Sequence, residues 1–393
     1  MLLQPKRYTI TVLLAAFILL ACQWAALVVV DPLRLFHKPW VRDDYFISEL
    51  RFQAAGIIRN AEFDSIILGT SMAANFSPRE ASQLWDAQFV NISPDGSWLS
   101  ERSIILNFAL TNKRLKNIII SLDGFHEYGK FHPSFPITNY DYLYNENRMD
   151  DLKAYLNLKY VKFLLCRNIM ISSGAFCKKA KSLETVTEWS SSKTNSKRFG
   201  GLNKWFESKN NGQIKQAFMK IAKGTRAIKS GTAEVLNKKD YSKKVKGDQL
   251  VFDHYVAHYI KENPDTQFYL YFPPHSRMSK ALLKKAKPSE YNRYIERMRY
   301  VVGAIERYPN AKAYGFDHLE LTNDIANYKD PSHHHPRFNS SILRWMKNKD
   351  HELTSENIEA YIKATSELAE SYDVVSFGEK IESFLSRGYS GSE

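Results

Sequence analysis

The 393-residue sequence has no fixed-period repeat and only three cysteines. The lack of a repeat excludes solenoid and other repeat architectures. Of the cysteines, Cys166 and Cys177 lie a short loop apart and Cys22 stands far from them. A disulfide between Cys166 and Cys177 fits an oxidising compartment, and two buried free thiols are the alternative. Hydrophobic residues make up 44% and aromatic residues 13%, which excludes general disorder.

Charge is lacking in one long segment near the N-terminus. Residues Tyr8–Val30 include no charged side chain, and as a helix they reach roughly 34 Å, enough to cross a bilayer. The apolar region of a cleavable signal peptide is shorter, about 7–15 residues. A lipoprotein-like cleavage site before Cys22 is another alternative, which the apolar sequence continuing to the end of the segment disfavours. The sequence therefore predicts residues 1–30 to be a cytoplasmic stub and a retained transmembrane anchor.

The charges that flank this segment predict its orientation. Lys6 and Arg7 precede it and Asp31 is the first charge after it. The positive-inside tendency then places the N-terminus in the cytoplasm and nearly all the rest outside.

The chain carries a formal net charge of +13, with 55 lysines and arginines against 42 aspartates and glutamates. Such an excess favours binding to nucleic acid, anionic lipid or an acidic polymer. The predicted external location excludes nucleic acid and leaves phospholipid headgroups and cell-envelope polysaccharide. A solvated basic surface that serves only solubility is the alternative.

After the anchor, the sequence alternates strand-like and helical patterns. Residues 31–60 are predicted as a juxtamembrane connector and residues 61–393 as an α/β domain, with a mostly helical and loop insertion at about 131–248. Short β-branched or aromatic runs predict strands at 65–68, 88–93, 117–122, 267–272 and near 311–316. Helices are expected around 78–85, 98–115, 152–165, 250–263, 289–308, 339–348 and 355–372. Strands separated by helices favour a doubly wound parallel sheet over hairpins.

Ser71 stands at the carboxyl end of the first predicted strand, shortly after Gly69. In open parallel sheets, ligands bind beyond the carboxyl ends of the strands. A serine at this point can face solvent while its own N–H, near a helix N-terminus, points at a developing negative charge. The alternative is that Ser71 serves only as a helix N-cap.

A serine nucleophile needs a base, and the base needs an orienting carboxylate. Asp330 and His333 lie three residues apart late in the chain. This spacing lets the carboxylate hold one imidazole nitrogen while the other faces the serine. His334 is the rival base, but neighbouring residues of an extended chain point to opposite sides. His275 follows the strand at 267–272 and either lines the same pocket or lies in solvent.

The histidine run also has two other interpretations. Residues 333–335 with Asp330 could bind a metal, or they could form a polar surface loop. No second histidine or carboxylate group with clear ligand spacing accompanies the run. A metal-dependent hydrolase is therefore the last-ranked hypothesis, and neither a metal nor a cofactor is predicted.

Three short motifs resemble a known family. "ILGTS" after a strand, "NISPDGS" one β-α unit later and "DPSH" near the end occur in the order of the first, second and last blocks of the SGNH (GDSL-like) hydrolase superfamily. The anchor, the "VDPLRLF" connector and "GTS" in place of Gly-Asp-Ser resemble its membrane-anchored branch, which includes alginate O-acetyltransferase-like and D-alanyl-transfer proteins of bacterial envelopes. The resemblance covers residues 31–350 without the insertion. It implies a flavodoxin-like three-layer α/β/α fold.

The resemblance also implies roles for individual residues. Ser71 would be the nucleophile, His333 the general base and then acid, and Asp330 the residue that orients His333. The backbone N–H groups of Ser71 and Gly96 would form the oxyanion hole.

The third block departs from the family pattern, since Asp123 stands where the family has an asparagine. An ionised aspartate cannot donate a hydrogen bond, and the loss of one oxyanion donor typically lowers a rate by about 10²–10³. Asn75 or Asn91 would be the substitute donor.

The sequence thus predicts a membrane-anchored, extracytoplasmic serine acyl-esterase or O-acyltransferase that acts on cell-surface polysaccharide. The expected location is a bacterial inner membrane, crossed once, with the catalytic domain in the periplasm or outside the cell. A membrane-bound acyl-donor protein is a further expected partner. The alternative is a catalytically inactive SGNH-fold protein that binds carbohydrate or assists envelope assembly.

Overall fold

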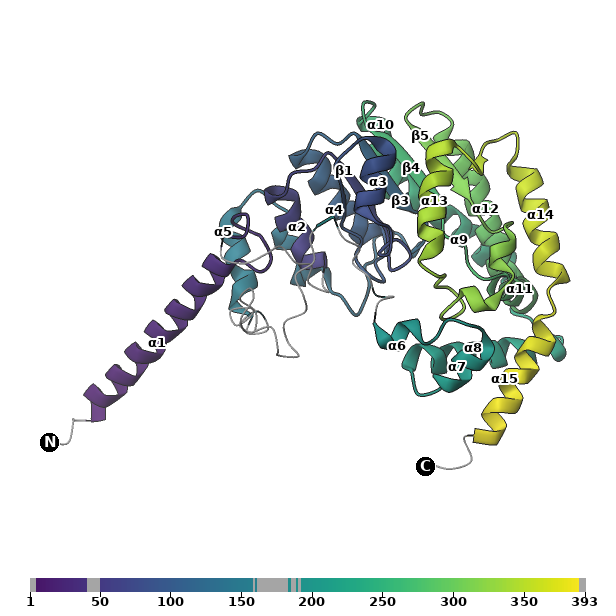
Figure 1. The fold of residues 1–393 in the computed structure, drawn as a ribbon, viewed down its shortest axis with the longest axis horizontal. Coiled ribbons are helices and arrows are strands. Elements are labelled where there is room, and N and C mark those ends of the chain that lie inside the picture. Colours follow the sequence, from purple (N-terminus) through teal and green to yellow (C-terminus); the bar gives the residue numbers. More distant parts are fainter. Residues whose placement is uncertain are drawn as a thin grey trace. The chain divides into compact units, whose positions relative to one another are not determined.

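The computed structural model (Figure 1) describes residues 5–40, 50–157, 160, 183–184, 189 and 192–388. Cys166 and Cys177, and with them the predicted disulfide, lie outside these residues. The chain divides into two compact units. The first unit comprises Met1–Glu62, Ile104–Arg114 and Pro133–Thr185, and the second, called the sheet unit, comprises Phe63–Ser103, Leu115–His132 and Val186–Glu393.

Helix α1 (Pro5–Val30) covers the charge-free segment. It is long and apolar enough to cross a membrane, and its side chains are mostly exposed. These are the length and composition that the sequence predicts for a membrane span.

Part of the predicted connector is a helix with ordered surroundings. Helix α2 (Leu50–Asn60) carries Arg59, whose guanidinium pairs with Asp151 and donates to the Leu143 and Asn145 carbonyls at 3.1 and 2.7 Å. The buried Asp31 carboxylate accepts the backbone N–H groups of residues 35–37 at 2.9–3.0 Å. The unit also contains η1 (Ile137–Asn139), η2 (Asp141–Leu143), α5 (Arg148–Asp151), η3 (Leu152–Leu156) and most of α4 (Leu99–Asn112).

The sheet unit is built on six strands in the order β2-β1-β3-β4-β5-β6. They are β1 (Ser65–Leu68), β2 (Phe89–Asn91), β3 (Asn117–Ser121), β4 (Gln267–Phe272), β5 (Ala311–Gly315) and β6 (Glu352–Leu353). The first five pair in parallel, which confirms the predicted α/β class and the five predicted strands. The predicted parallel sheet is confirmed only in part, because a sixth strand, β6, pairs antiparallel with β5 and makes the sheet mixed.

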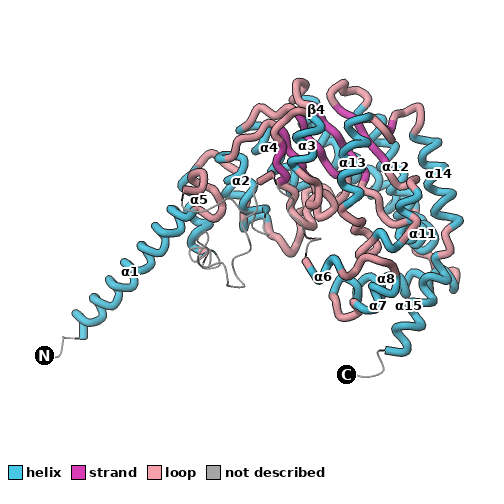
Figure 2. Tube along the Cα trace, viewed as in Figure 1, coloured by secondary structure: helices cyan, strands magenta, loops and turns pink. Residues whose placement is uncertain are grey.

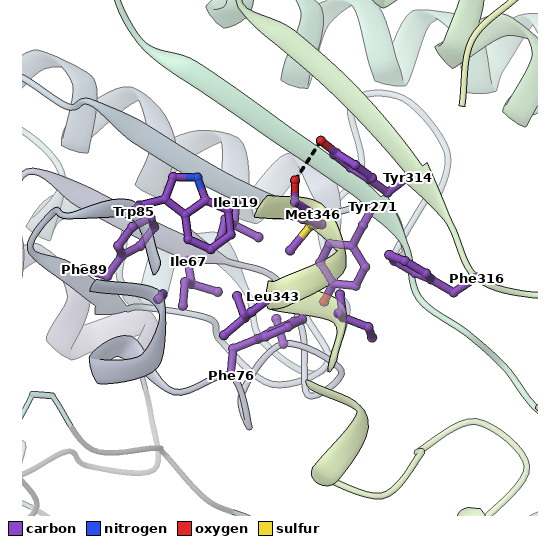
Figure 3. Close-up of a cluster of buried hydrophobic side chains, with 13 residues drawn as sticks. Ile67, Phe76, Trp85, Phe89, Ile119, Tyr271, Tyr314, Phe316, Leu343 and Met346 are labelled. Atoms are coloured by element: carbon purple, nitrogen blue, oxygen red, sulfur yellow. Dashed lines mark hydrogen bonds between the residues drawn. The ribbon is translucent and has the colours of Figure 1, made fainter. Parts of the chain in front are cut away.

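One face of the sheet is covered by α3 (Pro78–Trp85) and α13 (Arg337–Asn348), which lie side by side (Figure 1). Alternate strand residues such as Ile67, Ile119 and Tyr271 point to this face and pack in one buried cluster with Leu343 and Met346 (Figure 3). Because α13 follows the histidine run directly, this packing fixes that run at the same end of the sheet as the loop between β1 and α3.

The other face of the sheet meets α12 (Pro288–Ile305), as the ring contact of Phe272 with Tyr294 shows. Helices therefore flank the strands, as the colouring of Figure 2 makes visible. The remaining helical elements of the unit are α6 (Lys193–Ser196), α7 (Leu202–Glu207), α8 (Gly212–Lys229), α9 (Lys238–Phe252), η5 (Asp253–Ala257), α10 (His258–Glu262), α11 (Arg277–Ala286), η6 (Glu320–Thr322), η7 (Ile325–Asn327), α14 (Ile358–Ser371) and α15 (Val374–Gly388). A second buried cluster joins α8, α11 and α15 around Trp205, Phe218 and Ile381.

Candidate active site

The loop after β1 is held by close packing and by two serines from the loop after β2. A Cβ atom at Gly69 would lie 2.5 Å from Ala73 Cβ and from Ser121 Oγ, so the loop requires glycine there. Ser93 Oγ accepts the Gly69 N–H at 2.9 Å, and Ser97 Oγ donates to the Gly69 carbonyl at 3.3 Å. These contacts present the following residues, Thr70 and Ser71, at the carboxyl end of the sheet.

Ser71 is half-buried, and its side chain is not a helix cap. The N–H groups of Ala73 and Ala74 donate to the Thr70 carbonyl in a single helix-like turn, and regular helix begins only at Pro78. Ser77 caps that helix by accepting the Glu80 N–H. Ser71 Oγ instead lies 2.8 Å from His333 Nε2, across 262 residues of sequence.

The other nitrogen of the His333 ring meets Asp330. His333 Nδ1 lies 2.8 Å from both carboxylate oxygens of Asp330. These contacts are satisfied when Nδ1 carries the proton and Nε2 accepts from the serine hydroxyl. Asp330 Oδ1 also accepts the backbone N–H groups of Ser332 and His333 at 3.0 Å each. The three residues predicted as nucleophile, base and orienting carboxylate therefore form one continuous hydrogen-bonded chain.

The surroundings of Asp330 favour its ionised form. Burial alone raises the pKa of this carboxyl, but the His333 ring, the His333 backbone N–H and Lys329 together hold the pKa well below its usual range. Lys329 Nζ lies 3.6 Å from Asp330 Oδ2. Burial lowers the pKa of Lys329 to about 8, against the raising effect of Asp330.

Two residues next to the hydrogen-bonded side chains of Ser71, His333 and Asp330 were not predicted from the sequence. Trp189 donates from its indole Nε1 to the Ser71 carbonyl at 2.7 Å, and its ring lies 5.3 Å from the His333 ring, edge to face. The Lys329 ammonium sits 4.1 Å from the centroid of the Trp189 ring, a cation–π contact. Lys329 could have been noticed beside Asp330 in the sequence. Trp189 carries no such signal, because its position depends on the tertiary fold.

The backbone N–H groups of Ser71 and Gly96 have no acceptor among the described residues. Gly96 has φ of +62°, in the left-handed region that favours glycine, and it is exposed. Neither its N–H nor that of Ser71 donates to another described residue. The Ser97 contact with Gly69 ties the Gly96 loop to the Ser71 loop. Within the described residues, both N–H groups are thus uncommitted, as the predicted role requires.

Asp123 lies next to this region as an acceptor. Its carboxylate accepts the hydroxyl of Thr70 at 2.5 Å and that of Ser121 at 2.6 Å, and it pairs with the buried Arg102 at 3.6 Å. Arg102 also donates to the Asp123 carbonyl. The Asp123 side chain therefore ties the loops after β1 and β3 together and accepts hydrogen bonds there.

The two asparagines considered as substitute donors differ. Both amide hydrogens of Asn91 are used, since Nδ2 donates to the carbonyls of Ala73 and Phe76 at 2.9 and 3.1 Å. Asn91 is fully buried, and these two hydrogen bonds hold the turn after Ser71 in place. Asn75 is 5% exposed, and its Oδ1 has no hydrogen-bond partner among the described residues. This unpartnered atom is an acceptor, so it does not supply the N–H donor that an oxyanion needs.

The remaining histidines take separate positions. His334 is buried, and burial together with the His333 charge lowers its pKa to about 3. The pKa of His275 is lowered to about 4, first by burial and then by Lys280, and the His333 charge contributes. His335 packs its ring 4.8 Å from that of Phe199. His333, and not His334, is therefore the ring beside Ser71.

The described residues contain no group of three or more His, Cys, Asp or Glu side chains arranged to hold a metal ion. The three consecutive histidines face different partners, and the backbone of the run explains this, since His334 bridges to Tyr328 in an antiparallel pair.

Comparison of the chain with protein-family models, with curated proteins and with solved structures found no match.

Proposed function

We propose that the protein is a membrane-anchored serine acyl-esterase or O-acyltransferase of the SGNH type, acting outside the cytoplasm on cell-surface polysaccharide. The observation that carries the proposal is the chain from Ser71 Oγ through His333 to Asp330, with 2.8 Å at each step. The strand order β2-β1-β3-β4-β5 is also that of flavodoxin-like folds, in which ligands bind at the carboxyl ends of the strands.

The geometry supports acyl transfer in two steps. His333 Nε2 takes the Ser71 proton as Oγ attacks an ester carbonyl, and the N–H groups of Ser71 and Gly96 bind the resulting oxyanion. The ester C–O bond then breaks, the leaving alcohol takes the proton from His333, and the acyl group stays on Ser71. In the second step an acceptor hydroxyl gives its proton to His333 and attacks the acyl-enzyme. Water as acceptor gives hydrolysis, and a sugar hydroxyl gives transfer.

The anchor and the charge suggest the setting. Helix α1 would hold the sheet unit at the outer surface of a bacterial inner membrane, with the N-terminus in the cytoplasm. An acylated or acceptor polysaccharide would be the substrate there, and a membrane-bound protein would supply the acyl group to the transferase. No nucleic acid would be met on that side.

A serine-directed fluorophosphonate probe tests the proposal on the full-length protein. Labelling of the wild type is expected, with complete loss in Ser71→Ala and loss of at least about 10³-fold in His333→Ala. Ser341→Ala is the matched control. Ser341 is also half-buried, but it lies on α13 and is not part of the relay of Ser71, His333 and Asp330. Ester turnover that survives in a folded Ser71→Ala protein would contradict the proposal.

The Asp123 network favours a second candidate function, a catalytically silent carbohydrate-binding or envelope-assembly protein. The third oxyanion donor is replaced by an acceptor that the fold itself uses. This candidate predicts no labelling of the wild type at any pH, together with retained binding of polysaccharide.

A further inference from the structure

A groove in the sheet unit lies outside the Ser71 relay. It has a cavity volume of about 310 Å³ and is lined by Tyr128, Leu250, Asp253, His254 and His258. Pockets of about 300 Å³ and above are typical of small-molecule sites. Asp253 and His254 stand on η5, a π-helical turn, and such turns occur frequently at functional sites.

Tyr128 forms an aromatic platform at the edge of this groove. The residue is 43% exposed, although its ring is held in place by neighbours. One ring contact is a stack on Tyr255 at 5.6 Å, and the His254 ring meets it edge-on at 5.3 Å. Tyr255 in turn fixes the backbone, because its hydroxyl accepts the Gly129 N–H at 3.1 Å. A rigid, exposed ring with a negative face attracts the weakly positive C–H face of a sugar ring.

The polar groups of the groove are suited to bind the hydroxyl groups of an uncharged ligand. Asp253 Oδ2 accepts from the Tyr300 hydroxyl at 2.6 Å, and Oδ1 accepts from no described side chain. An ionised carboxylate is an acceptor only, so it binds hydroxyl donors and repels anions. Despite the net charge of +13, no lysine or arginine is among the described residues that line the groove.

The groove is linked to the candidate active site through one loop. Asp123, bonded to the residue before Ser71, begins the segment that reaches Tyr128 and Gly129. Along the same segment His126 stacks on Trp98 at 3.8 Å, two residues after Gly96. The segment between the loop of Gly96 and the groove therefore carries aromatic rings, with His126 stacked on Trp98 and Tyr128 lining the groove.

We infer that this groove is a subsite for an uncharged pyranose unit of the polysaccharide. The inference rests on the proposed function, because that function makes the polysaccharide a substrate. Its test is a direct binding measurement that needs no turnover. The ring of Tyr128 would stack on the apolar face of the sugar, while Asp253 would accept its hydroxyl hydrogens.

Calorimetric titration of the full-length Ser71→Ala protein tests this. The ligands are three uncharged hexasaccharides, β-1,4-linked glucose, N-acetylglucosamine and mannose, and one hexauronate. Saturable binding of at least one uncharged hexasaccharide is expected, with weaker binding of the hexauronate. Tyr128→Ala should weaken the binding about tenfold. The matched control is Phe135→Ala, since Phe135 is 39% exposed but does not line the groove.

Leu250→Arg is the second variant, because Leu250 is 46% exposed and its replacement leaves the core intact. It should abolish binding of the uncharged sugars by filling the groove. Binding that survives both variants, or tighter binding of the hexauronate, would overturn the inference. Fluorophosphonate labelling of the wild type separates the two proposals. Labelling without sugar binding would overturn only the subsite, and sugar binding without labelling would overturn only the catalytic proposal.

Discussion

The two sides of Ser71 are built differently. On the base side, the serine hydroxyl, His333 and Asp330 are side chains that bond to one another, and Lys329 and Trp189 enclose them. On the proposed oxyanion side, the proposed donors are the backbone N–H groups of Ser71 and Gly96, and the neighbouring side chain of Asp123 is an acceptor. In the proposed reaction, proton transfer would therefore use side chains that mutation can remove one at a time, whereas oxyanion binding would depend on the shape of two loops.

This difference suggests how the oxyanion side is kept in position. Asp123 joins Thr70, Ser121 and Arg102, so it spans the loops after β1 and β3. A negative charge next to the proposed oxyanion hole would oppose catalysis, and the Arg102 guanidinium, 3.6 Å from the Asp123 carboxylate, offsets this charge. The aspartate then acts as a positioning residue for the Ser71 loop.

Asp330→Asn should give the largest effect, because it breaks the base side alone. An amide at this position can donate to His333 Nδ1, which leaves the proton on Nε2 and prevents that nitrogen from accepting from Ser71. A loss of about 10⁴-fold in ester turnover and in labelling rate is expected, with unchanged sugar binding. Asp373→Asn, at an exposed aspartate, is the control. A loss smaller than tenfold would mean that the relay does not carry the reaction.

Asp123→Asn tests the oxyanion side. If Asp123 is a positioning residue, the amide leaves Arg102 without its ionised partner and places an N–H₂ group among hydroxyl donors. The free energy of unfolding should fall by about 1–3 kcal/mol in a denaturant titration, with no gain in labelling rate. A labelling rate that rises more than tenfold at unchanged stability would show instead that an asparagine here completes the hole.

The sequence predicted much of the fold and of the base side. Strands 65–68 and 267–272 have the predicted ends, since each is a short run of β-formers bounded by turn residues. The pair Asp330 and His333 was visible because a three-residue spacing is local. Strand β6 was missed because two residues carry no periodicity, and the α2 helix was missed inside the region predicted as a connector.

Contacts between distant segments were beyond sequence reasoning. Asn91 was considered as an oxyanion donor, but both its amide hydrogens bind carbonyls of the turn after Ser71. Trp189 reaches the Ser71 carbonyl across 118 residues, and its type and spacing give no hint of this. Whether a polar side chain is free or committed depends on neighbours that only the fold brings together.

The pH dependence of stability probes the histidines behind the base side. His275 and His334 have pKa values lowered to about 4 and about 3, chiefly by burial. Above about pH 7.5 both are neutral in the folded and the unfolded chain, so neither makes the free energy of unfolding depend on pH there. As the pH falls below 6.5, the unfolded chain binds protons that the folded protein does not bind, so the free energy of unfolding decreases.

His334→Gln should remove one of these protons. Between pH 6.5 and 4, the slope of unfolding free energy against pH should become shallower by up to about 1.4 kcal/mol per pH unit relative to the wild type. Chemical denaturation at half-unit pH steps measures the difference in slope between the two proteins. The contributions of titrating groups that the two proteins share cancel in this difference. Equal slopes in the two proteins would mean that His334 is protonated in the folded state.

Trp189 gives the smallest expected effect and bears on both sides of Ser71 at once. Trp189→Phe keeps a ring beside His333 and under the Lys329 ammonium but removes the N–H that binds the Ser71 carbonyl. One hydrogen bond of about 1 kcal/mol corresponds to a fall of about fivefold in labelling rate. Trp189→Ala also removes the ring that shields His333 from water, so with an ester donor and a sugar acceptor the ratio of hydrolysis to transfer should rise in this variant and stay unchanged in Trp189→Phe. Equal product ratios in both variants would assign Trp189 to holding the Ser71 backbone and leave water exclusion to other residues.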